Sequence, residues 1–156
     1  MFKKFDDFVA NKGNTAVDYV NANTEKIKTF TSAYQFEDFF RTVKMTPYDD
    51  IVAVKKDIMD DIDNTRLTTK ERDALLDNLK KDEKKVRSII HDDYRKAMNQ
   101  FTKMFKDFLI DTMPENLKSK ADIIYDRAYD QGHANGFTSI ANEFDDLCDF
   151  ASDIIK

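Results

Sequence analysis

The strongest constraint on the fold of this chain is an apolar stripe between Thr68 and Thr112 that advances in steps of four, four and three residues. These steps form an 11-residue repeat, which nearly matches the turn of an α-helix and so keeps its members on one side of a straight helix. Glu83 alone breaks the stripe. The stripe consists of Leu75, Leu79, Glu83, Val86, Ile90, Tyr94, Ala97, Phe101, Phe105 and Phe108.

Both ends of this segment carry boundary signals. Thr68 with Glu71 forms a capping-box signature, and Pro114 limits the other end. An unbroken helix over residues 69–112 would be about 65 Å long, at 1.5 Å per residue, so that only other long helices could cover its stripe. The polar run from Lys80 to Lys85 contains no helix breaker. We therefore expect continuity, and a compact bundle with a break in this run is the alternative.

The composition points to a fold without β-structure. Three glycines, two prolines and 35% charged residues leave little material for the tight turns of an all-β protein. The net charge of −5 is uneven: residues 69–112 carry 11 basic and 9 acidic side chains, and residues 115–156 carry 4 and 9. Opposite charges favour pairing of the two segments. We predict a single all-α domain over residues 1–156, an elongated bundle built on an antiparallel hairpin of residues 69–112 and 115–155.

Shorter helices are expected before residue 45. Residues 2–11 have helical apolar spacing and are followed by Gly13, a common residue at helix ends. Thr15 with Asp18 resembles a capping box for the next segment. The apolar positions after it predict one long helix, or two joined near residues 31–35.

A further helix is expected over residues 47–64. Thr46 has the role of a cap, Pro47 suits the first helical position, and Asp49 and Asp50 lie at the positive end of the helix dipole. Its buried side is Ile51, Val54, Ile58 and Ile62, and a turn at residues 64–66 precedes the long helix.

The segment after Pro114 continues with helical spacing and contains a line of small residues at Ala128, Gly132 and Gly136. Each glycine inside a helix costs about 1 kcal/mol against alanine, which close helix approach or a bend would offset. Residues 125–144 resemble a helix in small uncharacterised proteins of tailed bacteriophages, through Ala128, Tyr129, Gly132, His133, Gly136 and Phe137. The resemblance implies a bacteriophage origin and a helix-packing role.

No complete catalytic or metal-binding constellation is present in the sequence. Asp145, Asp146 and Asp149 form a DDxxD string without the second acidic motif and large cavity that diphosphate chemistry needs. Acidic pairs elsewhere lack the spacing of helical nucleotide pyrophosphatases, and the two histidines, His91 and His133, have no second ligand pair. We expect no enzyme, no cofactor and no metal.

Localisation follows from cysteine usage and hydropathy. The single Cys148 excludes an intrachain disulfide and fits a reducing compartment. No apolar run approaches the ~20 residues of a membrane span. A cytoplasmic protein is expected, in the host cell if it is phage-encoded.

In addition to the small-residue line, two surfaces are candidate interfaces. The face of Phe2, Phe5 and Phe8 could dock on a partner or on the chain's own bundle. A basic line follows the apolar stripe at Lys80, Lys84, Arg87, His91, Arg95, Lys103 and Lys106. It could follow a phosphate backbone, but interspersed aspartates favour pairing with the acidic C-terminal segment.

These features favour a non-catalytic helical protein-binding factor, a phage accessory protein acting on a host or phage protein. A self-associating structural or scaffold protein is the first alternative. An acidic mimic of nucleic acid is the second, with Asp122, Asp126 and Asp130 in one row. A protein partner or self-association is expected, and nucleic acid is not.

Overall fold

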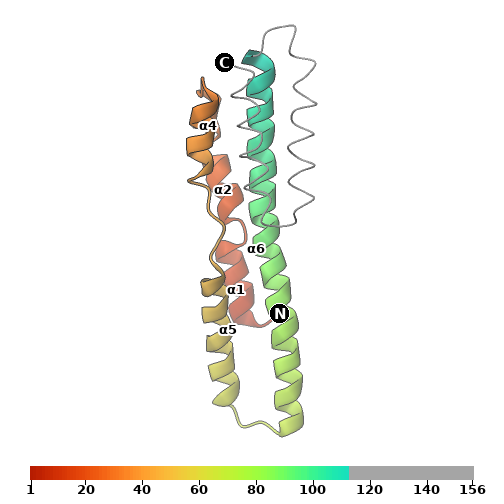
Figure 1. Cartoon of the computed structure of the whole chain (residues 1–156). Coiled ribbons are helices and arrows are strands. Elements are labelled where there is room, and N and C mark those ends of the chain that lie inside the picture. Colours follow the sequence, from red (N-terminus) through yellow and green to blue (C-terminus); the bar gives the residue numbers. More distant parts are fainter. Residues whose placement is uncertain (113–156) are drawn as a thin grey trace. The chain divides into compact units, whose positions relative to one another are not determined.

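A computed structural model describes residues 1–112, in which every regular element is a helix (Figure 1). The all-α class is confirmed for this part of the chain. The predicted second arm of the hairpin, residues 115–155, lies outside the described residues. The helices are α1 (Lys3–Lys12), α2 (Thr15–Ala22), α3 (Thr24–Lys28), α4 (Ala33–Phe40), α5 (Tyr48–Asp63) and α6 (Thr69–Thr112).

The predicted long helix is confirmed as α6, which runs without a break for 44 residues. Its capping box is formed as expected. The Glu71 amide donates to Thr68 Oγ1 at 3.2 Å, and the Thr68 amide donates to Glu71 Oε1 at 3.4 Å. The polar run at residues 80–85 is helical throughout, so the alternative of a broken helix is excluded.

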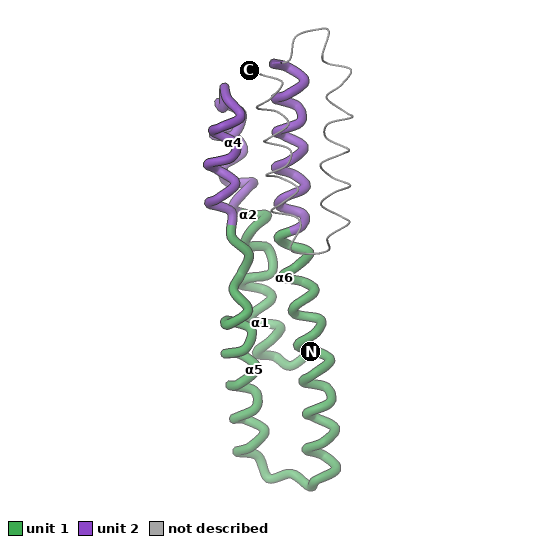
Figure 2. Tube along the Cα trace, in the orientation of Figure 1, with its two compact units in different colours: residues 1–18, 44–94 green, residues 19–43, 95–156 purple. Residues whose placement is uncertain are grey.

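The chain divides into two compact units (Figure 2). Within the described residues, unit 1 comprises Met1–Asp18 and Lys44–Tyr94, and unit 2 comprises Tyr19–Val43 and residues 95–112. Helices α2 and α6 contribute residues to both units.

Unit 1 is built on an antiparallel pair, α5 and α6, joined by the turn at residues 64–68 (Figure 1). Helix α1 packs on this pair and places Phe5, which is fully buried, in its core. Burial of such a side chain contributes about 1.5–3 kcal/mol. The predicted buried side of α5 is confirmed, with Val54 partly buried. The core consists of Phe5, Ile51, Ile58, Ile62, Leu79, Val86 and Ile90.

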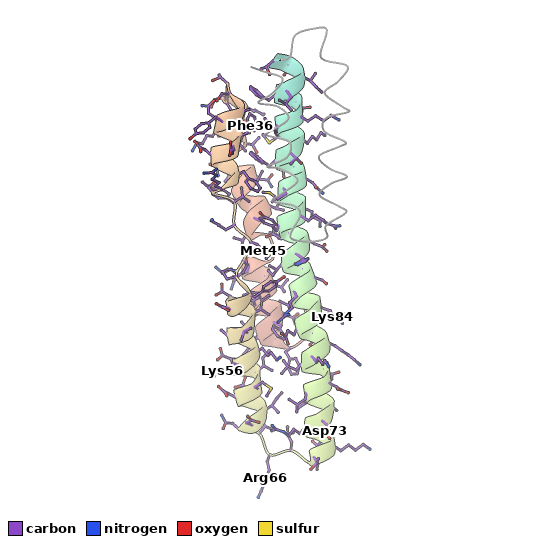
Figure 3. The ribbon with its side chains drawn as sticks, viewed as in Figure 1. Phe36, Met45, Lys56, Arg66, Asp73 and Lys84 are labelled. Carbon is purple, nitrogen blue, oxygen red and sulfur yellow. The ribbon has the colours of Figure 1, made fainter. Side chains whose placement is uncertain are left out.

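Unit 2 is held together by aromatic rings from α4 and the second half of α6. Phe36 of α4 is buried, and its ring centroid lies 4.8 Å from that of Phe105 and 5.0 Å from that of Phe108 (Figure 3). Phe39 reaches Phe101 at 5.2 Å. Tilted and edge-on pairs at these distances add to the free energy of burial, so this cluster anchors α4 on α6.

The segment between residues 15 and 44 differs from the prediction of one or two helices. Three helices are present, with breaks at Asn23 and at residues 29–32. Near the first break, Asn23 Nδ2 donates to the Tyr19 carbonyl and the Thr24 hydroxyl donates to the Val20 carbonyl. Such side-chain bonds to preceding carbonyls compete with the helix and bend it.

Two of the predicted caps are also wrong. The Thr15 hydroxyl donates to the Lys12 carbonyl at 2.9 Å instead of capping the amides of α2. Pro47, rather than Thr46, is the N-cap of α5, and the Thr46 side chain is buried. The predicted end of α1 is confirmed: the Gly13 amide donates to the Val9 carbonyl at 2.8 Å. A Cβ at Gly13 would lie 2.5 Å from that carbonyl oxygen, so glycine fits this close approach.

Candidate functional site

The one polar member of the α6 stripe lies at a contact with α5. Glu83 is 9% exposed, and its carboxylate binds two cations. Glu83 Oε2 lies 2.8 Å from Lys55 Nζ of α5, and Oε1 lies 2.9 Å from Arg87 one turn further along α6. A carboxylate in an apolar seam is stabilised when its oxygens are paired. Glu83 therefore joins the two helices.

Arg87 continues this network to the start of α5. Its guanidinium carbon lies 5.4 Å from the centroid of the Tyr48 ring, a distance suited to a cation–π contact. The Tyr48 hydroxyl oxygen lies 3.0 Å from Nε2 of His91, one turn beyond Arg87. A continuous polar network therefore runs from Lys55 to His91 along the junction of α5 and α6 in unit 1.

The junction also presents apolar groups to solvent. Tyr48 is 39% exposed, and Val52, one turn further along α5, is 48% exposed. Lys80 and Lys84 are exposed and precede Arg87 at helical spacing on α6, so they lie on the same side of that helix. We call these residues, namely Tyr48, Val52, Lys55, Lys80, Lys84, Arg87 and His91, the α5–α6 surface.

A second group of polar contacts involves two buried aspartates on α6. Both oxygens of Asp93 accept backbone hydrogen bonds from the start of α2, from Ala16 at 2.8 Å and Val17 at 3.0 Å. Asp82 accepts a bond of 3.1 Å from the amide of Phe2, the N-cap residue of α1. These carboxylates supply acceptors that the N-termini of α1 and α2 lack locally.

Two of the six acidic residues of α5 form ion pairs with neighbouring helices. Asp61 lies 2.7 Å from Lys4 of α1, and Asp63 pairs with Arg72 of α6. The hydrogen bond to Asp61 raises the pKa of the Lys4 amine above its ordinary value. Among residues 1–112, no group of three or more His, Cys, Asp and Glu side chains is placed to hold a metal ion.

An apolar groove of about 390 Å³ lies in unit 1 beside the turn that joins α5 and α6. Only Lys3, Lys4, Asp61 and Thr65 bring polar groups to it, and Asp61 is paired with Lys4. Its remaining lining residues are Phe2, Ile58, Ile62, Leu67 and Leu75. This groove does not gather groups for acid–base or nucleophilic chemistry.

The predicted interface residues have different positions in the structure. Phe5 is buried in the core of unit 1, and Phe2 and Phe8 are partly buried against that core. Of the two alternatives for this face, the structure shows packing on the chain's own helices, so the aromatic face is not an open contact surface.

The basic line is largely solvent-exposed. Lys80, Lys84, Arg87 and Arg95 are exposed on α6, and Arg87 is paired with Glu83. Its predicted pairing with the acidic C-terminal segment lies outside the described residues, as do Ala128, Gly132 and Gly136. None of the helices within residues 1–112 is long and apolar enough to cross a membrane.

Residues 41–151 match a family of unknown function, DUF8546. The chain belongs to this family. The matched region includes α5 and α6, and therefore the whole α5–α6 surface, whereas α1 to α4 precede it. No curated protein and no solved structure matches the chain.

Sequence reasoning did not identify Tyr48, Val52, Lys55 or the two buried aspartates as functional or structural contacts. One signal for the aspartates was present: Asp82 and Asp93 are separated by eleven residues, the period of the stripe itself. Tyr48 and Val52 carried the weaker signal of apolar residues four apart on α5, both of them outside its predicted buried side.

Proposed function

We propose that this chain is a non-catalytic helical protein-binding factor and that the α5–α6 surface contacts its partner. The observation that carries the proposal is the exposure of Tyr48 and Val52 on α5, with the Arg87 guanidinium over the Tyr48 ring. Aromatic and arginine side chains are enriched at the centres of protein interfaces. The resemblance of residues 125–144 to a helix in small proteins of tailed bacteriophages supports a bacteriophage accessory role.

The charge of this surface defines the kind of partner. Lys80, Lys84 and Arg87 form a cationic row on α6, with Lys55 opposite on α5. The carboxylate among them, Glu83, is already bound to two cations and is only 12% exposed in its side chain. The surface therefore suits an acidic amphipathic segment that covers Tyr48 and Val52 with apolar side chains.

Photo-crosslinking in cells tests this surface directly. A photoreactive phenylalanine analogue in place of Tyr48 should crosslink to one discrete protein, because the interface would cover that ring. The same analogue in place of Tyr34, which is 68% exposed on α4, is the matched control. Absence of a partner adduct from position 48, or an equal yield of the same adduct from position 34, contradicts the proposal. Adducts between two copies of the chain support self-association instead.

A substitution gives the second test. Val52→Glu adds a negative charge to the surface and should weaken partner binding at least about tenfold while the helical circular dichroism is retained. Ala53→Glu adds the same charge to an exposed neighbour on another side of α5. If both variants weaken binding equally, the effect is a general one of charge and the α5–α6 surface is not the contact.

We extend the proposal to the architecture: residues 115–155 form a second helical arm that returns antiparallel along α6. The support is the charge difference between residues 69–112 and residues 115–156, together with helical apolar spacing after Pro114. An antiparallel arm brings together residues that lie equally far in sequence from Pro114. Cys148 and Lys81 are nearly such a pair, and Lys81 is exposed and lies outside the α5–α6 surface.

Thiol crosslinking tests this arm. A short bismaleimide should join the native Cys148 to Lys81→Cys and should not join it to Lys103→Cys. The two positions on α6 are about 33 Å apart at 1.5 Å per residue, which exceeds the reach of the reagent. Preferential crosslinking to Lys103→Cys would overturn the straight antiparallel arm.

A further inference from the structure

The N-terminal segment, residues 1–18, depends on α6 for the polar groups that start its helices. Both carboxylate oxygens of Asp93 are occupied by the amides of Ala16 and Val17, and Asp93 is 3% exposed. Asp82 Oδ2 accepts the amide of Phe2. The acceptors are thus supplied from 76 to 80 residues away in sequence.

Local capping of these helices is weak. Phe2 is the N-cap residue of α1, and its apolar side chain makes no capping hydrogen bond. The Thr15 hydroxyl is directed to the Lys12 carbonyl. Helix starts carry amides without an intrahelical acceptor, and leaving these unpaired is costly in a buried setting. Release of the segment from α6 would remove the acceptors that it uses now.

The two helices are also short. α1 has 10 residues and α2 has 8, whereas isolated helices of fewer than about 12–15 residues are marginal in water. Helix formation in this segment is therefore coupled to docking. The DUF8546 match begins only at Arg41, so the segment lies outside the matched region that contains its acceptors.

We infer that residues 1–18 form a strap that opens as a separate unit from the α5–α6 pair, with Asp93 as the principal latch and Asp82 as the second. When closed, the strap covers Leu79, Val86 and Ile90 through Phe5 and its neighbours. When open, the strap uncovers Leu79, Val86 and Ile90 together with the carboxylates of Asp82 and Asp93. Opening of the latch therefore exposes these apolar side chains of α6 while α5 and α6 remain folded.

Amide hydrogen exchange on the full chain tests the strap. In the wild-type protein, amides of residues 3–18 should exchange faster than core amides of α5 and of residues 79–90. Asp93→Ala should accelerate exchange in residues 3–18 at least about tenfold, since two hydrogen bonds to a charged acceptor are lost. Amides of α5 and residues 79–90 should change less than about threefold.

Two further variants keep the test decisive. Asp93→Asn keeps one amide oxygen as an acceptor and should give an intermediate acceleration, and it remains informative if Asp93→Ala does not fold. Asp77→Ala removes an exposed aspartate from the same helix and should leave exchange in residues 3–18 unchanged. Equal acceleration in α1, α5 and α6 would show one cooperative unit and overturn the strap, as would unchanged exchange in residues 3–18.

Discussion

Lys55 of α5 and Glu83 of α6 form an ion pair of 2.8 Å that places a carboxylate within the apolar seam of unit 1. The Glu83 side chain is 12% exposed, whereas Lys55 and Arg87 are 39% and 49% exposed. The cations can therefore return to water if the carboxylate is removed. Only the Glu83 carboxylate is strongly desolvated, and the ion pair contributes little to the free energy of unfolding.

Replacement of Glu83 should show how little the ion pair contributes to the free energy of unfolding. Glu83→Leu completes the apolar stripe. It should lower the free energy of unfolding by less than about 1 kcal/mol, or raise it. Glu83→Ala leaves a void at the same contact and should destabilise by about 1–2 kcal/mol. Urea denaturation measures both, with Asp77→Ala as the exposed control. A loss of more than about 2 kcal/mol in Glu83→Leu would show that the ion pair itself holds α5 on α6.

The aromatic cluster of unit 2 should depend on one ring. Phe36 is 2% exposed and contacts three phenylalanines of α6. Phe36→Ala should therefore destabilise by about 3–5 kcal/mol, from lost burial and the cavity left behind. Tyr34→Ala, on the exposed side of the same helix, should cost less than about 0.5 kcal/mol. Equal thermal midpoints for the two variants would contradict the central position of Phe36.

Thr46 presents the opposite case of a polar group without a partner. Its hydroxyl is buried and makes no hydrogen bond within the described part of the chain. Thr46→Val keeps the shape of the side chain and removes the unpaired hydroxyl, so the free energy of unfolding should rise by about 0.5–1.5 kcal/mol. Thr42→Val is the control, because the Thr42 hydroxyl donates to the Phe39 carbonyl at 2.6 Å and its loss should not stabilise. Destabilisation of Thr46→Val would show that this hydroxyl is paired.

Alkaline stability should depend on Tyr94. Burial raises the pKa of the Tyr94 phenol above its ordinary value of about 10. A raised folded-state pKa gives stability that is fully present below about pH 10. That stability is lost as the pH rises further, because the unfolded phenol ionises first.

Urea unfolding across pH 9–11.5 measures this dependence. Tyr94→Phe should lose less stability above pH 10 than the wild-type protein. Tyr34→Phe, at an exposed position, should follow the wild-type curve. Parallel curves for the wild-type protein and Tyr94→Phe would contradict the assignment to this phenol.

Much of the fold could be predicted from local sequence. The apolar stripe and the Thr68–Glu71 pair define the long helix because both signals act within a few turns of one helix. The buried side of α5 follows for the same reason. The break before Ser32 lies next to the join offered at residues 31–35. The break at Asn23 could not be placed this way, because apolar spacing continues across it while side chains bind the backbone.

The candidate site was less predictable, since it depends on contacts between segments. Asp93 caps α2 across 77 residues of sequence, and nothing near Thr15 signals that acceptor. The basic row was visible as a sequence pattern, but its relation to Tyr48 follows only from the antiparallel placement of α5 beside α6. Exposure of Val52 likewise depends on which side of α5 the neighbouring helices cover.

The eleven-residue repeat of α6 has a consequence for changes in chain length. Insertion of one residue between Asp82 and Asp93 rotates every later side chain by about 100° around the helix axis. Asp93 would then turn away from α2, while Asp82 would stay in place. Insertion of eleven residues completes three turns and restores the original faces to within about 20°. Length variants of this helix that keep the same residues on each face should therefore differ by multiples of eleven residues.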